Sequence, residues 1–237
     1  MKSMIALAAL VVAAGAAQAA TVAYWAFPAT VPSSSTNYNI TWPINADLKA
    51  NAGLATLDTD ASKYDGSASP TAVQQGNMQL FTGTTVNLQS SYVAGSDLRM
   101  RSLNGIANGK SIIMRFDASG FQDLVLSYAE RSTSTGATSA QVFYSTDGTN
   151  YTAAVSSYAI TADSTYRLRT VDLSSIGAIE FASTVYLKIT FNGFSATSPS
   201  GNTAVDNVLI DGTFIPAPGS LALVGLGGLV AARRRRA

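Results

Sequence analysis

The heptapeptide 185–191, VYLKITF, has the clearest strand pattern in this sequence. Its apolar side chains occupy every second position: Val185, Leu187, Ile189 and Phe191. Lys188 and Thr190 point to the opposite face of such a strand. A period of two is typical of a strand that buries one face and exposes the other to water. The heptapeptide therefore predicts a sheet whose inner face packs on a second layer.

Six further segments have the composition of strands, with β-branched and aromatic residues between turn-forming ones. In chain order they are residues 22–27, 112–116, 123–129, 140–145, 166–172 and 204–210. Several short strands separated by turns predict an all-β fold, an antiparallel β-sandwich.

The remaining part of the body, residues 28–100, is rich in Ser, Thr, Asn and Gly. We interpret it as looped strands that pack on the same sandwich. Residues 46–57 are the one candidate for a turn or two of helix, although Asn51 and Gly53 have low helix propensity.

Composition excludes several kinds of site. The chain has 237 residues, no Cys and no His. Without His, a Ser-His-Asp or Cys-His nucleophilic site cannot be built, and the commonest zinc ligand is missing. Lys2 and the four C-terminal arginines lie in terminal segments, so ten basic residues face fourteen acidic ones in the body. This mildly acidic body lacks the excess of positive charge that nucleic-acid binding requires.

The first 19 residues have the pattern of a signal peptide. Lys2 precedes an apolar run at residues 4–14, and Ala17 and Ala19 form the small-x-small pattern of a cleavage site. We place the cut after Ala19. The alternative, a buried core helix, leaves the leading cation and the strand-like sequence that follows without an explanation.

The last 23 residues, 215–237, are apolar and then strongly basic. A Pro216-Ala217-Pro218 break precedes the apolar run 221–232, and the chain finishes with Arg233, Arg234, Arg235, Arg236 and Ala237. The run predicts a hydrophobic helix, although about 20 residues are needed for a comfortable membrane span. Arginines stay on the cytoplasmic side of a membrane, so the body of the chain is expected outside.

This C-terminal order of motifs resembles the PEP-CTERM sorting signal, which exosortase-type membrane proteases of Gram-negative bacteria process. The usual motif is Pro-Glu-Pro, and Ala217 stands here in place of the Glu. The resemblance implies export and sorting at the cell envelope, with the inner membrane and a sorting protease as partners of the tail. The alternative is a plain membrane anchor without a sorting step.

The body, residues 20–214, has a second resemblance, which spans roughly residues 22–214. An Ala-Tyr-Trp-x-Phe opening at 23–27, a Phe-x-Gly-Thr-Thr-x-Asn block at 81–87 and an Asp-Asn-Val close at 206–208 occur in this order. They resemble the jelly-roll-like modules of secreted bacterial proteins. That resemblance implies a β-sandwich and secretion, and no settled activity.

Three acidic segments are candidates for a calcium site. Residues 147–150, Asp-Gly-Thr-Asn, suit either a cation or a hairpin turn, and the turn is the simpler interpretation. Asp58, Asp60 and Ser62 begin like an EF-hand loop but lack its Gly and its closing Glu, which favours a polar loop. Asp206-Asn207 is the best candidate; the alternative is side-chain bonding to the backbone amides of a neighbouring loop.

The two glutamates, Glu130 and Glu180, are the obvious carboxylates for a glycosidase, which needs a facing pair. Nothing in the sequence pairs them, and Glu130 beside Arg131 is more simply a surface charge or a weak ion pair. Trp25, Trp42 and the ten tyrosines suit either sugar stacking or the core.

Together these features predict an exported cell-surface or extracellular-matrix protein with a structural or interaction role and no catalytic activity. The alternative is a carbohydrate-binding module that binds a polysaccharide, with calcium as a candidate stabilising ion. A carboxylate-only hydrolase is the third hypothesis.

Overall fold

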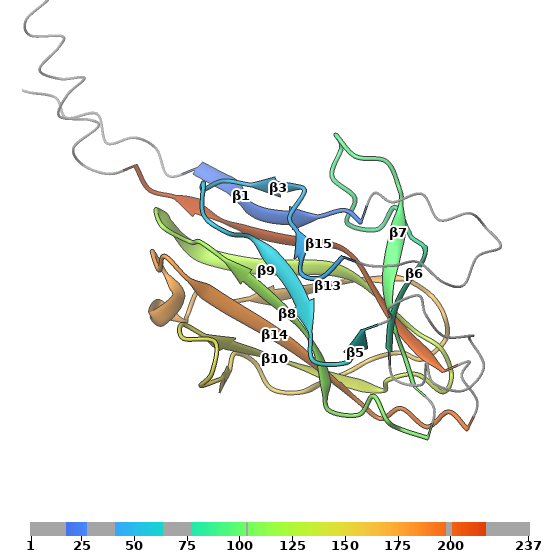
Figure 1. Cartoon of the computed structure of the whole chain (residues 1–237). Coiled ribbons are helices and arrows are strands. Elements are labelled where there is room, and N and C mark those ends of the chain that lie inside the picture. Colours follow the sequence, from blue (N-terminus) through green and yellow to red (C-terminus); the bar gives the residue numbers. More distant parts are fainter. Residues whose placement is uncertain (1–17, 28–40, 64–76, 103, 198–200, 217–237) are drawn as a thin grey trace, which may run out of the picture.

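The computed structural model describes residues 18–27, 41–63, 77–102, 104–197 and 201–216. They form two β-sheets packed face to face (Figure 1). The part of the chain described here contains no α-helix, and its single helical element is the 3-10 turn η1, Gly177–Ile179. Within these residues, no helix has the length and the apolar character that crossing a membrane requires. The prediction of an all-β antiparallel sandwich is confirmed.

The first sheet, sheet A, is centred on the long C-terminal strand β15. Its strands follow in spatial order: β13 (Arg167–Asp172), β9 (Phe121–Ser132), β15 (Asn202–Phe214), β7 (Ser96–Arg101), β6 (Asn77–Thr82) and β5 (Ser62–Lys63). β1 (Gln18–Trp25) also pairs with β15, and β3 (Leu48–Lys49) pairs with β1. All these pairs are antiparallel except β5 with β6.

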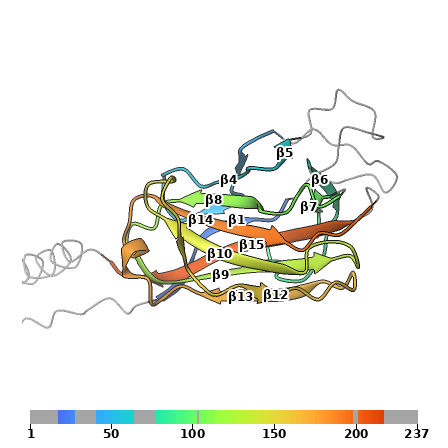
Figure 2. The ribbon, with the colours of Figure 1, turned by 90° about the horizontal axis from the view of Figure 1, so that it is seen from below.

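The second sheet, sheet B, is centred on β14 and β8. Its spatial order is β11 (Thr152–Ala153), β10 (Ser139–Ser145), β14 (Val185–Asn192), β8 (Lys110–Phe116), β4 (Thr56–Thr59) and β2 (Ile44–Asn45). β12 (Tyr158–Ala159) pairs with the opposite end of β10. The long strands β8, β9, β10, β13, β14 and β15 alternate between the two sheets along the chain (Figure 2).

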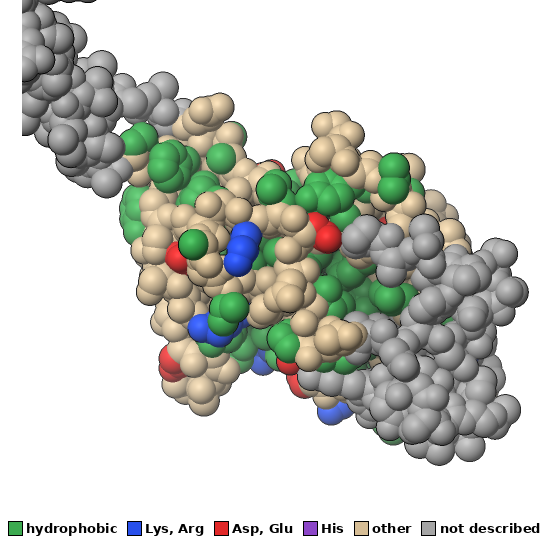
Figure 3. All heavy atoms as spheres, turned by 45° about the horizontal axis from the view of Figure 1, so that its top comes forward, with side chains coloured by type: hydrophobic (Ala, Val, Ile, Leu, Met, Phe, Trp, Pro, Cys, Tyr) green, Lys and Arg blue, Asp and Glu red, His purple; other side chains and the backbone are tan. Residues whose placement is uncertain are grey.

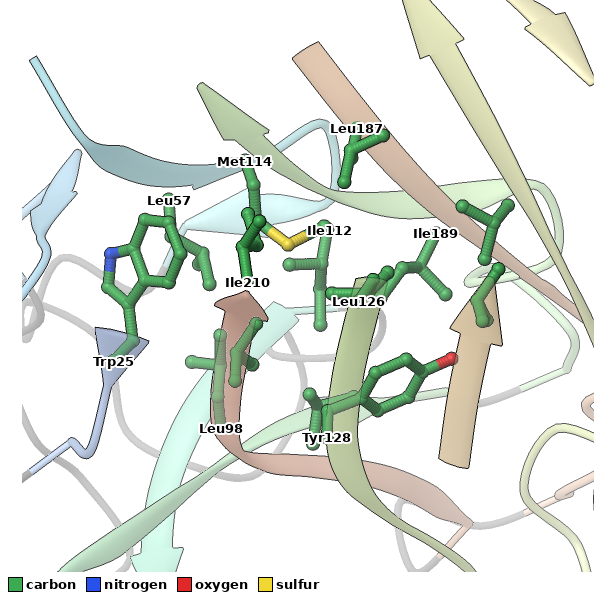
Figure 4. Packing of buried hydrophobic residues seen from close by; sticks show 14 of the residues in the cluster. Trp25, Leu57, Leu98, Ile112, Met114, Leu126, Tyr128, Leu187, Ile189 and Ile210 are labelled. Atoms are coloured by element: carbon green, nitrogen blue, oxygen red, sulfur yellow. The ribbon is translucent and has the colours of Figure 1, made fainter. Parts of the chain in front are cut away.

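The core lies between the sheets and has the alternation that the sequence predicts. On β14 the apolar residues Val185, Leu187 and Ile189 are fully buried, while Lys188 and Thr190 are half-buried on the outside. Figure 4 shows side chains of both sheets meeting in this layer. Each fully buried aliphatic side chain contributes roughly 1.5–3 kcal/mol of transfer free energy.

All seven predicted strands are present, and most extend by a few residues beyond the predicted ends. Residues 46–57, the one segment considered for a turn or two of helix, form β3 and the start of β4 instead. The expectation of looped strands in residues 28–100 is confirmed for its described residues, which include β2 to β7. The short strands in this region, of two to four residues, form because they pair with neighbouring strands. Such pairing is a tertiary effect, which the strand propensity of the local sequence does not predict.

Candidate functional site

The outer face of sheet B carries two rows of side chains that are set by strand register. One row crosses the sheet through Thr56, Arg115 and Tyr186, which are paired residues on β4, β8 and β14. The next row, two residues further along each strand, consists of Asp58, Ile113, Lys188 and Phe143. Side chains of neighbouring rows on one face lie within reach of each other. Register therefore brings aromatic, cationic and acidic groups from four strands onto one surface.

The turn between β10 and β11 forms a wall at one side of this surface. Asp147 organises it: Oδ1 accepts hydrogen bonds from the backbone amides of Thr149 and Asn150, each at 2.8 Å, and from the Ser145 hydroxyl at 2.8 Å. The side-chain amide of Asn150 donates to Oδ2 at 2.7 Å, and this bond, together with those to Oδ1, holds the pKa of Asp147 well below its usual range. The prediction of a hairpin turn at residues 147–150 is confirmed, and both oxygens of Asp147 are engaged within the turn.

Gly148 brings this turn onto the ring of Tyr186. It has a φ of +74°, in the left-handed region that favours glycine. A Cβ at this position would lie 2.9 Å from Cζ of Tyr186. The turn backbone therefore lies directly against the Tyr186 ring and fixes its position.

A groove of about 290 Å³ opens between this turn, the strand β4 and Pro43, which precedes the edge strand β2. Ile113 and Arg115 of β8 and Tyr186 of β14 come from the sheet itself. The residues lining the groove are Pro43, Thr56, Asp58, Ile113, Arg115, Gly148, Tyr151 and Tyr186. The groove is thus lined by two tyrosine rings, one guanidinium group and one carboxylate.

Cations lie close to the aromatic rings of this face. Arg115 Cζ is 5.8 Å from the ring centroid of Tyr186. Lys188 Nζ is 4.0 Å from the centroid of Tyr151 and 5.2 Å from that of Phe143. Such cation–π contacts stabilise the rings in fixed orientations. Burial raises the pKa of Tyr151, so its hydroxyl keeps its proton and can donate a hydrogen bond.

These groups suit recognition of a polyhydroxylated ligand. Tyrosine rings offer an apolar surface with a polar tip. A guanidinium group offers a planar set of donors, and a carboxylate accepts hydrogen bonds from hydroxyl groups. Asp58 is the one carboxylate among the residues that line the groove, whereas glycoside hydrolysis needs two carboxylates that flank the bond.

The predicted polar loop is present at Asp60, which lies in the bend after β4, whereas Asp58 lies within β4 itself. Oδ1 of Asp58 accepts a hydrogen bond from the Thr59 amide at 2.8 Å, and Oδ1 of Asp60 accepts one from the Ser111 amide at 2.5 Å. Ser62 begins β5 in sheet A, so the three residues do not share one loop. The role of Asp58 in the groove was not predicted.

Asp206 and Asn207 fasten the loop between β6 and β7 to the outer face of sheet A. Oδ2 of Asp206 accepts a hydrogen bond from the Thr84 amide at 2.7 Å. Nδ2 of Asn207 donates to the carbonyls of Thr84 and Val86, both at 2.8 Å, and Oδ1 accepts from the Tyr24 hydroxyl. Of the two predicted alternatives, side-chain bonding to a neighbouring loop is confirmed. Burial raises the pKa of Asp206 to about 7.

The interpretation of Glu130 as a surface charge is wrong. Glu130 is 4% exposed, and Oε1 accepts a hydrogen bond from Arg169 at 3.1 Å. Oε2 accepts from the Tyr158 hydroxyl at 3.2 Å. The carboxylate faces inward because it continues the buried alternation of β9. Glu180 instead accepts from the Asp123 amide at 3.5 Å, so none of the described contacts joins the two glutamates.

One tryptophan lies in the core and the other packs against it. Trp25 is fully buried and its Nε1 donates to the carbonyl of Ile44 at 3.3 Å. Trp42 is partly buried and packs against the same core. Of the two interpretations of the tryptophans, the structural one is therefore confirmed.

The predicted targeting residues fall largely outside the described chain. Ala19 lies in β1 opposite Thr213, and Pro216 is the last described residue. The others lie outside the described residues: Ala17, Ala217, Pro218, Arg233, Arg234, Arg235 and Arg236.

The residues of the groove were missed because they come from separate strands and one turn. One signal was available. The heptapeptide 185–191 places Tyr186 on the same outward face as Lys188, and an outward-facing Tyr in a strand is a candidate contact residue.

No family model and no curated protein matches the chain. Among solved structures it is similar to the K1 cleaved adhesin domain of Lys-gingipain from Porphyromonas gingivalis, with 11% identity, a TM-score of 0.44, and 81% of this chain and 97% of that chain covered. It is similar to TmCBM61 in complex with β-1,4-galactotriose, with 7% identity, a TM-score of 0.38, and 65% and 86% covered.

A third similar structure is the enzymatically active domain of tailspike protein 4 of bacteriophage CBA120, with 12% identity and a TM-score of 0.41. The match covers 68% of this chain but only 19% of the tailspike chain, so this chain spans about one fifth of that protein.

Proposed function

We propose that this chain is an exported, non-catalytic surface protein that binds a polysaccharide in the groove on the outer face of sheet B. The observation that carries the proposal is the placement of Tyr151 and Tyr186 in an open groove beside Arg115 and Asp58. A sugar ring packs its C–H face on an aromatic ring while its hydroxyl groups bond to polar neighbours. The aromatic rings and the polar groups that such binding needs all line the same groove.

The position of the rings supports a preformed site. Tyr186 is held by the Gly148 backbone on one side and lies near the Arg115 guanidinium group, and Tyr151 lies near the Lys188 ammonium group. Rings that are already fixed lose little conformational entropy when a ligand binds. A rigid sheet with two fixed aromatic residues is well suited to bind an extended chain of sugars.

A binding role without catalysis is supported by the residue types that are present. The sequence has no His, and the groove is lined by a single carboxylate, Asp58. Neither a His-based nucleophile nor a pair of carboxylates is therefore offered to a bound glycan.

Export and envelope sorting remain part of the proposal. Cleavage after Ala19 removes Gln18 and Ala19 from the start of β1, and the pairing of β1 with β15 from Ala20 to Trp25 is kept. The alternation of long strands between the two sheets supports a jelly-roll-like arrangement. We further propose that the tail, residues 215–237, anchors or sorts the protein at the inner membrane, with the sandwich outside.

The test is a glycan array probed with the exported protein and with a Tyr151→Ala/Tyr186→Ala double variant. Binding of a glycan by the wild-type protein and its loss in the double variant are expected. Phe181→Ala is the control, because Phe181 is an exposed aromatic residue outside the groove. Absence of binding to every glycan, with and without calcium, would remove the proposal.

A further inference from the structure

One end of the sandwich is organised by the loop 117–120 between β8 and β9. The side-chain amide of Asn51 donates hydrogen bonds to two carbonyls of this loop, at 3.1 and 3.0 Å. An amide of the loop donates to the carbonyl of Ala182 at 2.9 Å, and the amide of Ile215 donates to a loop carbonyl at 2.8 Å. The β3–β4 connection, the segment after η1 and the end of β15 are therefore neighbours.

Three large apolar side chains are exposed at this end. Leu54 is 56% exposed, Phe181 is 47% exposed and Phe214 is 40% exposed. The Phe214 ring lies 5.3 Å from the ring of buried Phe121, which ties it to the core edge. Figure 3 shows hydrophobic side chains grouped where the described chain stops. Single exposed apolar residues are ordinary, but three at the same end of the sandwich make this end a candidate contact surface.

The length of the chain restricts what can face this surface. β15 ends at Phe214, and the apolar run of the tail begins at Leu221. The six residues 215–220, which connect β15 to this apolar run, span at most about 20 Å when fully extended. The 13 residues of β15 run for about 40 Å along the sandwich. If the tail enters a membrane, the end with Phe181 and Phe214 is held near it, and the opposite end is held away.

We propose that this end of the sandwich docks on the surface of the lipid bilayer through Leu54, Phe181 and Phe214. The proposal rests on membrane insertion of the tail, which is part of the proposed function. Exposed Phe and Leu side chains gain free energy by entering the boundary between headgroups and acyl chains. Glu180 directly precedes Phe181, and its carboxylate, which accepts from the Asp123 amide, keeps the docking shallow. The outer face of sheet B then stands upright on the membrane, with Thr56, Arg115 and Tyr186 of the groove at its membrane-side end.

The absence of Cys from the sequence allows a site-specific test. Phe181→Cys and Phe214→Cys variants of the full chain are labelled with an environment-sensitive fluorophore and reconstituted into phosphatidylcholine vesicles that carry a headgroup spin label. Ile106→Cys is the matched control: Ile106 is 56% exposed, and its loop bonds to Ala196 and Phe191 at the opposite end of the sandwich.

A blue shift and quenching by the spin-labelled lipid are expected at positions 181 and 214, with neither at 106. Equal, water-like emission at all three positions in protein that floats with the vesicles would overturn the docking while the membrane anchor stands. Protein that does not float with the vesicles at all would overturn both the anchor and the docking. Glycan binding by the groove is independent of either result.

Discussion

The Gly148 backbone lies against the ring of Tyr186, so closely that a methyl group at Gly148 would come within 2.9 Å of Cζ. This contact joins the β10–β11 turn to the outer face of β14. It couples the wall of the groove to the aromatic residue in it.

A Gly148→Ala substitution is therefore expected to weaken both the turn and the groove. The left-handed backbone at φ +74° alone makes Ala less favourable by about 1 kcal/mol. The new methyl group also pushes the turn away from Tyr186. Urea unfolding measures the first effect and glycan affinity the second. An Ala variant that retains full affinity would show that the turn is not part of the binding site.

The tyrosine rings are expected to supply most of the affinity. Tyr186→Ala should weaken glycan binding by about 2 kcal/mol, roughly thirtyfold, because it removes a fixed aromatic surface. Tyr186→Phe keeps the ring and should bind with near wild-type affinity. Isothermal titration calorimetry on both variants checks this. Equal losses in the Phe and Ala variants would mean that the hydroxyl group, and not ring stacking, carries the interaction.

Asp206 should make folding stability depend on pH. Its pKa is raised by burial from 3.8 to about 7, so between these values the folded state binds more protons than the unfolded state. Stability from this group is complete below pH 4, falls as pH rises, and is lost above about pH 7, a change of a few kcal/mol. Asp206→Asn should flatten this dependence. Denaturant unfolding from pH 4 to 8 tests it, and identical slopes in both proteins would contradict it.

The buried ion pair predicts a contrast between two neighbouring arginines. Arg169→Ala leaves the carboxylate of Glu130 buried without its cation and should destabilise the fold by about 3 kcal/mol. Arg167→Ala removes only an exposed pair with Asp163 and should change stability little. Thermal unfolding of the two variants compares them directly. Similar small effects in both would show that Glu130 is solvated or protonated in the folded protein.

The sequence predicted the two-layered sandwich correctly, but it did not predict which side chains face inward on every strand. On β14, alternation identified the buried residues correctly, since apolar and polar side chains are cleanly separated there. On β13 the same alternation places Arg169 and Leu168 on opposite faces of the strand. The residue that faces inward is Arg169, whereas Leu168 is 56% exposed. Arg169 faces inward because its register partner is Tyr128, beside Glu130, and this ion pair cannot be seen from the local pattern.

The groove could not be predicted because it depends on register between distant strands. Arg115 and Tyr186 meet only because β8 pairs with β14 at this offset, and Asp58 joins them through the short strand β4. The turn chemistry at residues 147–150 was readable locally, since Asp-Gly favours a hairpin. What the turn covers, the Tyr186 ring, is a tertiary contact.

Hydrogen–deuterium exchange of the full chain, with and without each soluble polysaccharide of a panel, tests the central claim most directly. The account predicts slower exchange in peptides that contain residues 111–115, 146–151 and 184–190, which form the groove on sheet B. It predicts no change around residues 83–88 on the opposite face. Protection confined to the outer face of sheet A, or no protection by any polysaccharide, would contradict the assignment of the groove as a glycan-binding site.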